Sequence, residues 1–389
     1  MDVFGGRYPY GEHRKPYVQA RRPGRGAHST GFLRRCVDCK GAVAVSKVLL
    51  VGGAGYVGSV LAEELLERGY AVRILDRLYY GDIGLRDIRD RVELVVADMR
   101  NVGPEVFEGV DALVNVGGLS NDPTAEYNPK ANREMNTNAS LALAETCKKL
   151  GIRRYIFASS CSIYDRGVGS DEKDVLQDET SVVNPKAAYS RSKYDAERGL
   201  LEMADDSFCP VILRKATVFG FSPRMRYDLV VNTFVKDAMS RGVLTLHYGG
   251  EMWRPLVDVR DAARAYIACL EADEDKVRGE IFNVSFQNLR ISELALRVRE
   301  ALRQVGLNVD IRPDYGYKGV RSYRVSSKKI QSVLGVYPKV TVEDSVIDMV
   351  EKIKAYGYTD FDNPRYYNIQ WMRLLEEAHK VISNTGSVF

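Results

Sequence analysis

The fold of this chain is decided by the stretch Lys47-Val48-Leu49-Leu50-Val51-Gly52-Gly53-Ala54-Gly55-Tyr56-Val57-Gly58. Residues 47–51 are mostly apolar and predict a short buried strand, and residues 60–68 carry apolar side chains at helical spacing. The glycines between them predict a tight turn. A strand, a glycine-rich turn and a helix in this order predict the first βα unit of a parallel sheet, whose helix N-terminus can bind phosphate groups.

A carboxylate follows the next expected strand, residues 71–75, at Asp76, which lies 18 residues after Gly58. In a dinucleotide-binding unit, a carboxylate at this position accepts hydrogen bonds from the adenosine ribose and repels a 2′-phosphate. Arg77 could tolerate that phosphate, but Asp76 favours NAD over NADP. The residues expected at the cofactor's pyrophosphate are Gly52, Gly55, Tyr56, Val57 and Gly58.

Apolar strands and helices continue to alternate along the chain. Residues 92–96, 112–116 and 155–158 predict strands, and residues 130–150 predict a helix. This alternation predicts an α/β fold with a Rossmann-like, doubly wound parallel sheet, which binds ligands at the carboxyl ends of its strands. The residues that follow these strands, and that we therefore expect around the cofactor, are Asp98, Met99, Gly117 and Ser160.

A tyrosine and a lysine lie four residues apart in the later stretch Tyr189-Ser190-Arg191-Ser192-Lys193. On a helix this spacing places both side chains on one face. A sugar alcohol needs a base beside the carbon that gives up its hydride. A tyrosine with a pKa of ~10 is mostly protonated at neutral pH, so we expect the ammonium of Lys193 and the nicotinium charge to stabilise the phenolate of Tyr189. Ser160 is expected to hold the substrate oxygen. These three form the predicted catalytic set, and Tyr189 and Lys193 are also expected to contact the cofactor.

Over residues 47–352 these motifs, in this order, resemble the extended short-chain dehydrogenases/reductases, and within them the NAD-dependent sugar-nucleotide epimerase/dehydratase group. The matching segments are Gly52-x-x-Gly55-x-x-Gly58, Leu75-Asp76-Arg77-Leu78-Tyr79-Tyr80-Gly81, Asp98, Asn136, Ser159-Ser160-Cys161-Ser162-Ile163-Tyr164, and Tyr189 with Lys193. The resemblance implies a nucleotide-diphosphate sugar as substrate, NAD as cofactor, and a homodimer formed through residues 131–150 and the helix of Tyr189.

The resemblance also implies that basic residues between two lobes bind the diphosphate of the substrate. Arg254, in Trp253-Arg254-Pro255-Leu256-Val257-Asp258-Val259-Arg260-Asp261, matches an arginine that contacts phosphate in the family. Arg226 is a further candidate, because guanidinium groups bind phosphate bidentately. The full set of predicted substrate-binding residues is Ser120, Ser160, Thr217, Arg224, Asn232, Arg254 and Arg321.

Several positions depart from the family pattern. Dehydratases of this group carry Asp-Glu after the active hydroxyl, but Cys161 and Ser162 stand here, which argues against a 4,6-dehydratase. Thr217 stands where many 4-epimerases have an asparagine, and Asp258 stands where a histidine is common. Gly117-Gly118 replaces frequent alanines. These departures leave the hydride-transfer residues complete and the identity of the sugar open.

These residues are compatible with three functions. The preferred one is an NAD-dependent epimerase that oxidises C4 to a transient 4-keto sugar and returns the hydride to the other face. The alternative is an NAD(P)-dependent 4-ketoreductase or dehydrogenase of a nucleotide sugar. A distant alternative is a non-catalytic NAD-binding regulatory or nucleic-acid-binding protein.

The charge distribution argues against nucleic-acid binding by the globular part. Of 56 Lys/Arg and 52 Asp/Glu, residues 1–46 hold nine and three, so the remaining 47 Lys/Arg face 49 Asp/Glu. Residues 1–46 are rich in Arg, Gly and Pro and are expected to be disordered or loosely attached. They contain no secretory apolar segment, so neither export nor a membrane span is expected.

The cysteines and histidines exclude other kinds of site. Cys36 and Cys39 have zinc-ligand spacing, but no second pair follows. The other four cysteines are scattered singly, which fits a reducing, cytoplasmic location. None of the four histidines lies in a recognisable catalytic segment, so neither a Ser-His-Asp hydrolase nor a metal site is expected.

With 389 residues, of which 45% are hydrophobic, the chain can bury a large core. We expect a basic extension at 1–46, an NAD-binding Rossmann domain at 47–214, and a smaller α/β substrate-binding lobe at 215–389 with segments that return to the first domain. The Tyr-rich stretch 356–371 has no assigned role.

Overall fold

The computed structural model describes residues 17–18, 45–164, 175–316 and 321–387. Its centre is an eight-stranded sheet with the order β1-β4-β3-β2-β5-β6-β8-β12. All neighbours in this sheet are parallel except β1 and β4. The strands are β1 (Tyr17–Val18), β2 (Lys47–Val51), β3 (Ala71–Asp76), β4 (Glu93–Val96), β5 (Ala112–Asn115), β6 (Arg154–Ser160), β8 (Cys209–Lys215) and β12 (Glu280–Val284). The predicted parallel sheet is confirmed.

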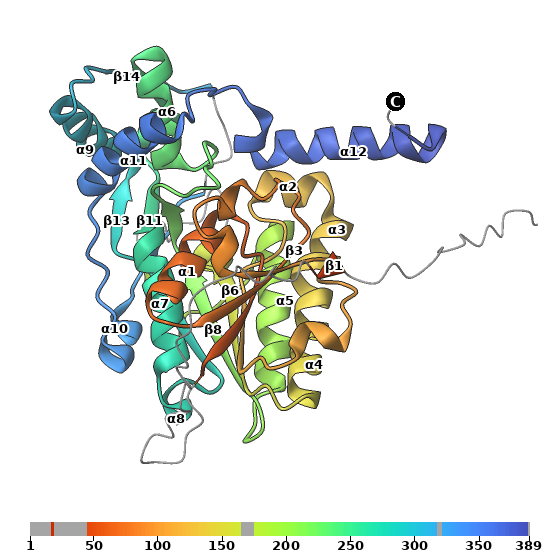
Figure 1. The fold of residues 1–389 in the computed structure, drawn as a ribbon. Helices are drawn as coiled ribbons and strands as arrows, with labels where there is room; N and C mark the ends of the chain where they lie inside the picture. Colours follow the sequence, from red (N-terminus) through yellow and green to blue (C-terminus); the bar gives the residue numbers. More distant parts are fainter. Residues whose placement is uncertain (1–16, 19–44, 165–174, 317–320, 388–389) are drawn as a thin grey trace, which may run out of the picture.

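Helices cover both faces of this sheet because its central strands are apolar on both sides. Along β2, Val48 and Leu50 belong to one buried cluster, which α1 and α7 complete. Leu49 and Val51 belong to a second cluster on the other face, which α4 and α5 complete. Figure 1 shows α1 and α7 on one side of the sheet and α4 and α5 on the other. The helices of this part are α1 (Tyr56–Glu67), α2 (Asp122–Tyr127), α3 (Pro129–Arg133), α4 (Ala139–Lys149), α5 (Ala188–Glu202), α7 (Val259–Glu271) and α8 (Glu274–Val277).

The expected helix at 130–150 is one continuous helical run with a π-helical turn at Glu134–Asn138 between α3 and α4. The expected helix at 60–68 begins earlier, at Tyr56, because its first turn belongs to the glycine-rich segment. Six 3-10 turns connect the larger elements within the described residues: Ile83–Leu85, Arg89–Arg91, Pro104–Phe107, Cys161–Tyr164, Tyr248–Gly250 and Pro364–Tyr366.

A second lobe has its own apolar core, built around α6, α9 and α11, and these helices lie together at the upper left of Figure 1. Three small sheets accompany it, with the orders β10-β14, β13-β11-β9 and β15-β7. The remaining helices are α6 (Val230–Arg241), α9 (Ile291–Gln304), α10 (Lys328–Leu334), α11 (Val342–Tyr356) and α12 (Asn368–Thr385). Of these, α10 packs on the core of the first lobe through Ile330 and Leu334. The strands are β7 (Leu176–Gln177), β9 (Thr217–Phe219), β10 (Val243–His247), β11 (Trp253–Asp258), β13 (Gln287–Arg290), β14 (Asp310–Asp314) and β15 (Arg324–Val325).

The chain crosses between the two lobes more than once. The helix α7 and the strand β12 come after residue 214 in sequence, yet they pack on and extend the first sheet. The Tyr-rich stretch packs on the second lobe, where Tyr227 contacts Tyr366 with ring centroids 4.9 Å apart and Phe361 at 5.4 Å. From there α12 runs outward along the first lobe (Figure 1).

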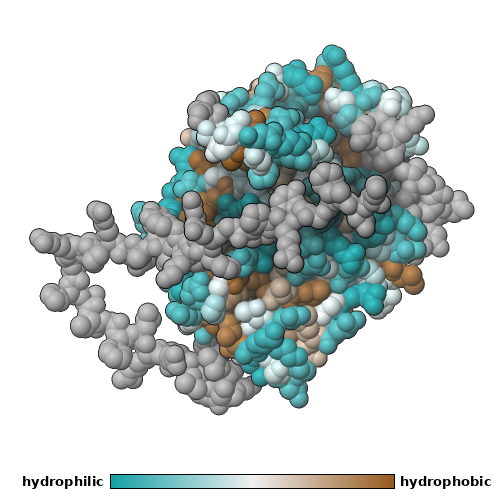
Figure 2. Space-filling view, turned by 90° about the vertical axis from the view of Figure 1, so that its right-hand side faces the viewer, coloured by the Kyte–Doolittle hydropathy of each residue, from teal (hydrophilic) through white to brown (hydrophobic). Residues whose placement is uncertain are grey.

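The side of the molecule that carries α3, α4 and α5 is drawn in Figure 2, where hydrophilic side chains predominate and a band of hydrophobic ones lies in the lower half. Within the described ranges, no helix combines the length and the apolar character that a membrane span requires.

Candidate active site

A cavity of about 460 Å³ lies where β2, β3, β5, β6 and β8 end and the second lobe begins. A ligand is expected at this edge of a doubly wound sheet. The predicted site residues that line the cavity are Gly52, Gly55, Tyr56, Val57, Gly58, Asp76, Arg77, Asp98, Met99, Gly117, Ser120, Ser160, Tyr189, Lys193, Thr217, Arg224, Arg254 and Arg321. The structure therefore brings together residues that are up to 269 positions apart in sequence.

The glycine-rich turn is so compact that side chains would not fit into it. Gly52 has φ +78°, and a Cβ on it would lie 2.6 Å from the Cα of Gly117. A Cβ on Gly58 would lie 2.1 Å from the carbonyl oxygen of Gly52. The helix α1 starts directly after the turn, and no side chain caps its first amides. Its N-terminus therefore presents backbone N–H groups and a partial positive charge to the cavity.

Two acids face the expected adenosine end of the cavity. The carboxylate of Asp76 accepts hydrogen bonds from the backbone amides of Ala54 at 3.0 Å and Leu78 at 2.8 Å, which fixes its direction. Asp98 accepts hydrogen bonds from Arg77 at 2.7 Å and from Arg100 at 2.5 Å. Because Arg77 is paired with Asp98, Asp76 is the residue that discriminates between a ribose 2′-hydroxyl and a 2′-phosphate. This arrangement suits NAD better than NADP.

Tyr189 and Lys193 lie on α5 and both line the cavity; Lys193 is buried and Tyr189 is partly exposed toward the cavity. Burial raises the pKa of Tyr189 to about 12, while the charge of Arg226 and a hydrogen bond with Ser160 act to lower it. Burial also lowers the pKa of Lys193 to about 8, and Glu197 acts against this change. Arg226 of the second lobe therefore acts on the phenol, a role that the sequence did not indicate, and stabilisation of the phenolate by Lys193 and the nicotinium charge stays a prediction.

Asn136, the asparagine of the family motif, lies in the π-helical turn. The amide nitrogen of Asn136 donates to the backbone carbonyl of Leu119 at 2.9 Å and to Ser192 at 3.2 Å. These bonds join the loop after β5 to the helix that carries Tyr189 and Lys193. Gly118, with φ +123°, lies so close to Asn136 that a Cβ would come within 2.2 Å of its side-chain oxygen. A glycine at this position therefore allows the two segments to approach each other.

The cavity contains a second lysine that was not predicted from the sequence. Lys215, at the end of β8, lines the cavity together with Ser160 and Tyr189. Its ammonium donates to the backbone carbonyl of Ser159 at 3.1 Å. Burial lowers the pKa of Lys215 to about 7, and the charge of Lys193 adds to this effect. Within the described part of the chain, no carboxylate forms an ion pair with it, so the sheet end holds two ammonium groups.

The basic residues between the lobes differ in their partners. Arg226 pairs with Asp228 at 2.8 Å and donates to Ser120 at 3.3 Å. Arg254 donates to the backbone carbonyls of Trp253, at 2.8 Å, and of Arg321. Arg321 in turn contacts Asp122. These side chains lie on the side of the cavity that carries Tyr189, where Tyr323 also influences the phenol, and they are therefore suited to a bound substrate.

Arg224 lies elsewhere, on the side of the expected cofactor. Its charge acts on Asp76, and its guanidinium carbon lies 3.7 Å from the centre of the Tyr80 ring. Asn368, at the start of α12, accepts a hydrogen bond from it at 2.6 Å. Neither Tyr80 nor Asn368 was predicted as a site residue. Tyr80 lies within the ribose-binding motif but was given no role of its own, and nothing in the sequence indicates that Asn368, far beyond the motifs, lies next to the cofactor loop.

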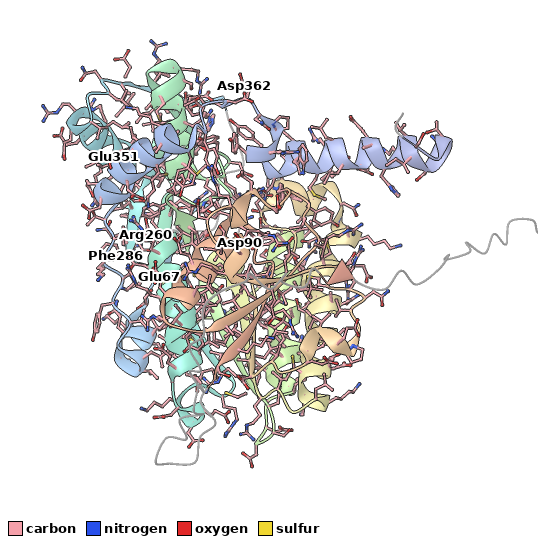
Figure 3. The ribbon with its side chains drawn as sticks, viewed as in Figure 1. Glu67, Asp90, Arg260, Phe286, Glu351 and Asp362 are labelled. Carbon is pink, nitrogen blue, oxygen red and sulfur yellow. The ribbon has the colours of Figure 1, made fainter. Side chains whose placement is uncertain are left out.

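The structure does not bring Asn232 to the cavity. Its side chain is fully buried and bonds to Tyr56 at 3.1 Å, to the amide of Gly220 at 3.1 Å and to the carbonyl of Arg226 at 2.9 Å. Asp258 is likewise structural: it caps α7 and pairs with Arg260, labelled in Figure 3, at 2.9 Å.

The positions that follow the active hydroxyl cannot replace the missing acids of a dehydratase. Cys161 is completely buried, its thiol contacts the backbone carbonyl of Arg214 at 3.0 Å, and burial raises the pKa of this thiol far above its usual range. The backbone amide of Ser162 donates to Ser160 at 3.2 Å. Among the described residues, no group of three or more His, Cys, Asp or Glu side chains could hold a metal ion. Cys36 and Cys39 lie outside the described residues.

Comparison with known proteins identifies the family. The model of the NAD dependent epimerase/dehydratase family matches residues 48–285, which is more than half of the chain. This chain belongs to that family. It is therefore an NAD-dependent enzyme of the extended short-chain dehydrogenase/reductase type, as the motifs predicted, and its cofactor is NAD.

Several curated relatives have the names of UDP-sugar enzymes. The chain is 24% identical over 318 residues to the UDP-N-acetyl-alpha-D-glucosaminuronate decarboxylase of Bacillus cytotoxicus, covering 78% of this chain and 97% of the relative. It is 26% identical over 328 residues to a putative UDP-glucose 4-epimerase of Methanocaldococcus jannaschii, covering 80% and 100%. The solved UDP-glucose 4-epimerase of Thermotoga maritima, with UDP-glucose, has a TM-score of 0.69 at 24% identity, covering 80% of this chain and 99% of that one. This likeness confirms the fold.

The residues of this chain fit NAD. The side-chain-free turn at Gly52 and Gly58 leaves room for a pyrophosphate against the N-terminus of α1. Asp76, fixed by backbone amides, and Lys193 line the same cavity, where we expect Asp76 to accept hydrogen bonds from the adenosine ribose and Lys193 to bond to the nicotinamide ribose. We expect these residues to hold NAD, which when bound accepts a hydride from a carbinol carbon and can return it.

Proposed function

We propose that this enzyme is an epimerase of a nucleotide-diphosphate sugar that works through a transient 4-keto intermediate. The observation that carries the proposal is the meeting of Ser160, Tyr189 and Lys193 in the cavity of the glycine-rich turn. Oxidation at C4, rotation of the keto sugar and return of the hydride to the other face need no external reductant.

Each residue has a role in this cycle. Ser160 bonds to the C4 oxygen, and the phenolate oxygen of Tyr189 takes its proton as the C4–H bond breaks. When the hydride returns to C4, Tyr189 gives the proton back, so the protein ends each cycle in its initial state. Arg226 favours the phenolate form of Tyr189 electrostatically. Arg254 and Arg321 are the proposed diphosphate ligands, and Ser120 and Thr217 are proposed to contact the sugar.

The experiment is direct. Purified enzyme, given UDP- or dTDP-hexoses and no added cofactor, is expected to convert each accepted sugar to its C4 epimer, which NMR identifies. Strict consumption of NAD(P)H for every turnover would instead establish the 4-ketoreductase alternative. We also expect NAD(H), not NADP(H), in the purified protein.

Lys215 supports a second candidate, in which the sugar is a hexuronate. An ammonium without an acidic partner in the cavity can pair with a sugar carboxylate, and the Bacillus cytotoxicus relative is a decarboxylase of a uronate. Oxidation at C4 makes the carboxylate a β-keto acid. The C5–C6 bond then breaks, CO2 leaves, C5 takes a proton, and return of the hydride yields a pentose. Release of CO2 from a UDP-hexuronate distinguishes this reaction from epimerisation.

We also propose a homodimer through α4 and α5. Support comes from the hydrophobic band on this side of the molecule in Figure 2 and from Leu150, which is half exposed at the end of α4. Sedimentation velocity tests the proposal, and a monomer at micromolar concentration would contradict it.

A further inference from the structure

Arg224 is a buried cation that forms no ion pair with a described carboxylate, although the charges of Asp228 and Asp76 act on it from a longer distance. It is 3% exposed and lines the cavity. Asn368 accepts a hydrogen bond from its terminal nitrogen, and its Nε has no hydrogen-bond partner. Across the residues that the structure describes, no carboxylate lies within ion-pair distance of it. Arg226, two residues later, is by contrast paired with Asp228.

Burial of such a charge is costly. A guanidinium removed from water loses favourable hydration, and this loss destabilises the protein unless an anion compensates. The stacking of Arg224 on Tyr80 offsets part of this loss, since a cation over an aromatic face is attracted to the ring. Burial still lowers the pKa of Arg224 to about 10. The described carboxylates near Arg224, those of Asp76 and Asp228, do not reach ion-pair distance, so the site has room for an anion in direct contact with this guanidinium.

The position of Arg224 identifies that anion. A Cβ on Gly84 would lie 2.4 Å from the carbonyl oxygen of Ala54 in the glycine-rich turn and 3.1 Å from the Cβ of Arg224. Ser222 donates a hydrogen bond to the carbonyl oxygen of Tyr56 at 2.8 Å, in the first turn of α1. The loop of Arg224 thus packs on the helix N-terminus where a dinucleotide places its phosphates.

We propose that Arg224 is the counter-charge of the cofactor's pyrophosphate, and that the C-terminal helix α12 holds it in place through Asn368. Asn368 is 4% exposed and has several fixed bonds: its side-chain nitrogen donates to Ser120 at 2.8 Å and its backbone amide to Asp228 at 3.2 Å. The C-terminal helix is then part of the cofactor site, although the family model ends at residue 285.

A second contact brings α12 to the same place. The indole nitrogen of Trp371 donates to the backbone carbonyl of Tyr79, in the loop that follows Asp76. One turn of α12 therefore contacts both Arg224 and the ribose-side loop. The inference concerns how NAD is held and does not depend on which sugar the enzyme converts.

The first test is Arg224→Gln, measured without sugar substrate. Calorimetric titration of cofactor-free protein is expected to show dissociation constants for NADH and NADPH that both rise at least about tenfold, because both carry the pyrophosphate. The matched control is Arg297→Gln, which removes an arginine paired with Glu343 far from the cavity. Unchanged constants, a loss confined to NADPH, or a raised KM for the sugar nucleotide alone would each overturn the proposal.

The second test uses stability. Before the cofactor binds, the buried charge of Arg224 has no carboxylate of the described residues in direct contact. Arg224→Gln is therefore expected to raise the Tm of the cofactor-free enzyme and to reduce the rise in Tm that NADH produces. A lower Tm with an unaltered response to NADH would make Arg224 a purely structural residue.

The third test addresses α12. Asn368→Leu is expected to weaken NADH binding several-fold in the wild-type background and to have no further effect in the Arg224→Gln background, because Asn368 acts through Arg224. Arg373→Ala, on the same helix over the ring of Tyr127, is the control and is expected to bind NADH normally. Equal losses in both backgrounds would show that Asn368 does not position Arg224.

Discussion

The phenol of Tyr189 lines the cavity and has a raised pKa, and because Tyr189→Phe removes only the hydroxyl that moves the proton, we expect it to affect the chemical step more than NAD binding. We expect Tyr189→Phe to lower kcat at least about 100-fold, with the NAD(H) content of the purified protein unchanged. Tyr194→Phe, on the same helix but outside the cavity, is the control. Near-normal turnover by Tyr189→Phe would remove this residue from the mechanism.

Lys215 should leave a signature in the pH dependence of stability. Its pKa of about 7 in the fold lies below that of the unfolded chain, ~10.4, so the unfolded chain binds the proton more tightly between these values. This group therefore destabilises the fold below pH 7, and the penalty fades as pH rises toward 10.5. We expect Lys215→Met to have a Tm above wild type at pH 6.5 and an advantage that shrinks by pH 10.

The comparison for Lys215 is Lys328→Met, an exposed lysine on α10, which should show the same small difference at every pH. Lys193 contributes a dependence of the same sign to wild type and Lys328→Met, whereas the difference for Lys215→Met also includes the loss of the repulsion between Lys193 and Lys215. A Tm difference for Lys215→Met that does not vary with pH would mean that the lysine is accommodated without a penalty.

The positions of some site residues could be predicted from the sequence, whereas those of others could not. Ser160, Tyr189 and Lys193 were predictable because the chemistry requires fixed types at fixed spacing. Asn232 was not, because an asparagine that bonds to Gly220 inside the lobe has the same letter as one that faces a substrate. Lys215 ends a strand whose neighbours gave no reason to place it near Lys193.

Among the elements, the turn before α1 gives the sharpest prediction. A methyl group at Gly58→Ala would meet the carbonyl oxygen of Gly52 at 2.1 Å and the Cα of Gly53 at 2.7 Å, both of them backbone atoms that cannot rotate away. The turn must open, and we expect the dissociation constant for NAD to rise at least about tenfold with a lower Tm. Glu63→Ala, exposed on α1, is expected to bind NAD normally. Calorimetric titration decides, and tight binding by Gly58→Ala would show that the turn adapts.

Elements with long apolar patterns were predictable and short ones were not. The strands β2 and β3 and the helix α5 lie where the apolar pattern predicted them. Each is at least five residues long, so its buried positions form a recognisable pattern in the sequence. The strands β7, β9 and β15 have two or three residues, too few for any pattern to show. The role of α12 at the cofactor was equally hidden, since its contacts with Tyr79 and Arg224 arise from the path of the whole chain.

At the scale of the whole molecule, the core crosses the domain boundary that the sequence suggested at residue 214. One buried cluster joins Val48 and Leu61 of the first segment to Tyr266 and Phe282 of the second. Arg154 donates to the backbone carbonyls at the end of α7, those of Cys269 and Ala272. The sequence predicted that segments of the second lobe return to the first domain, but it did not predict which ones, because nothing local distinguishes a strand that joins the first sheet from one that stays in the second lobe.

A fragment of residues 45–214 should therefore fail to fold. It would lack β12, which pairs along β8 from Glu280 opposite Val211 to Val284 opposite Lys215, and would expose the backbone of β8 as an open edge. It would also lose α7, whose side chains complete the apolar cover of α1. We expect aggregation or a state without near-ultraviolet circular dichroism, whereas residues 45–387 should unfold in one cooperative transition that NAD shifts upward. If the short fragment instead binds NAD and melts sharply, the first lobe is an independent domain and the shared core is not required for its fold.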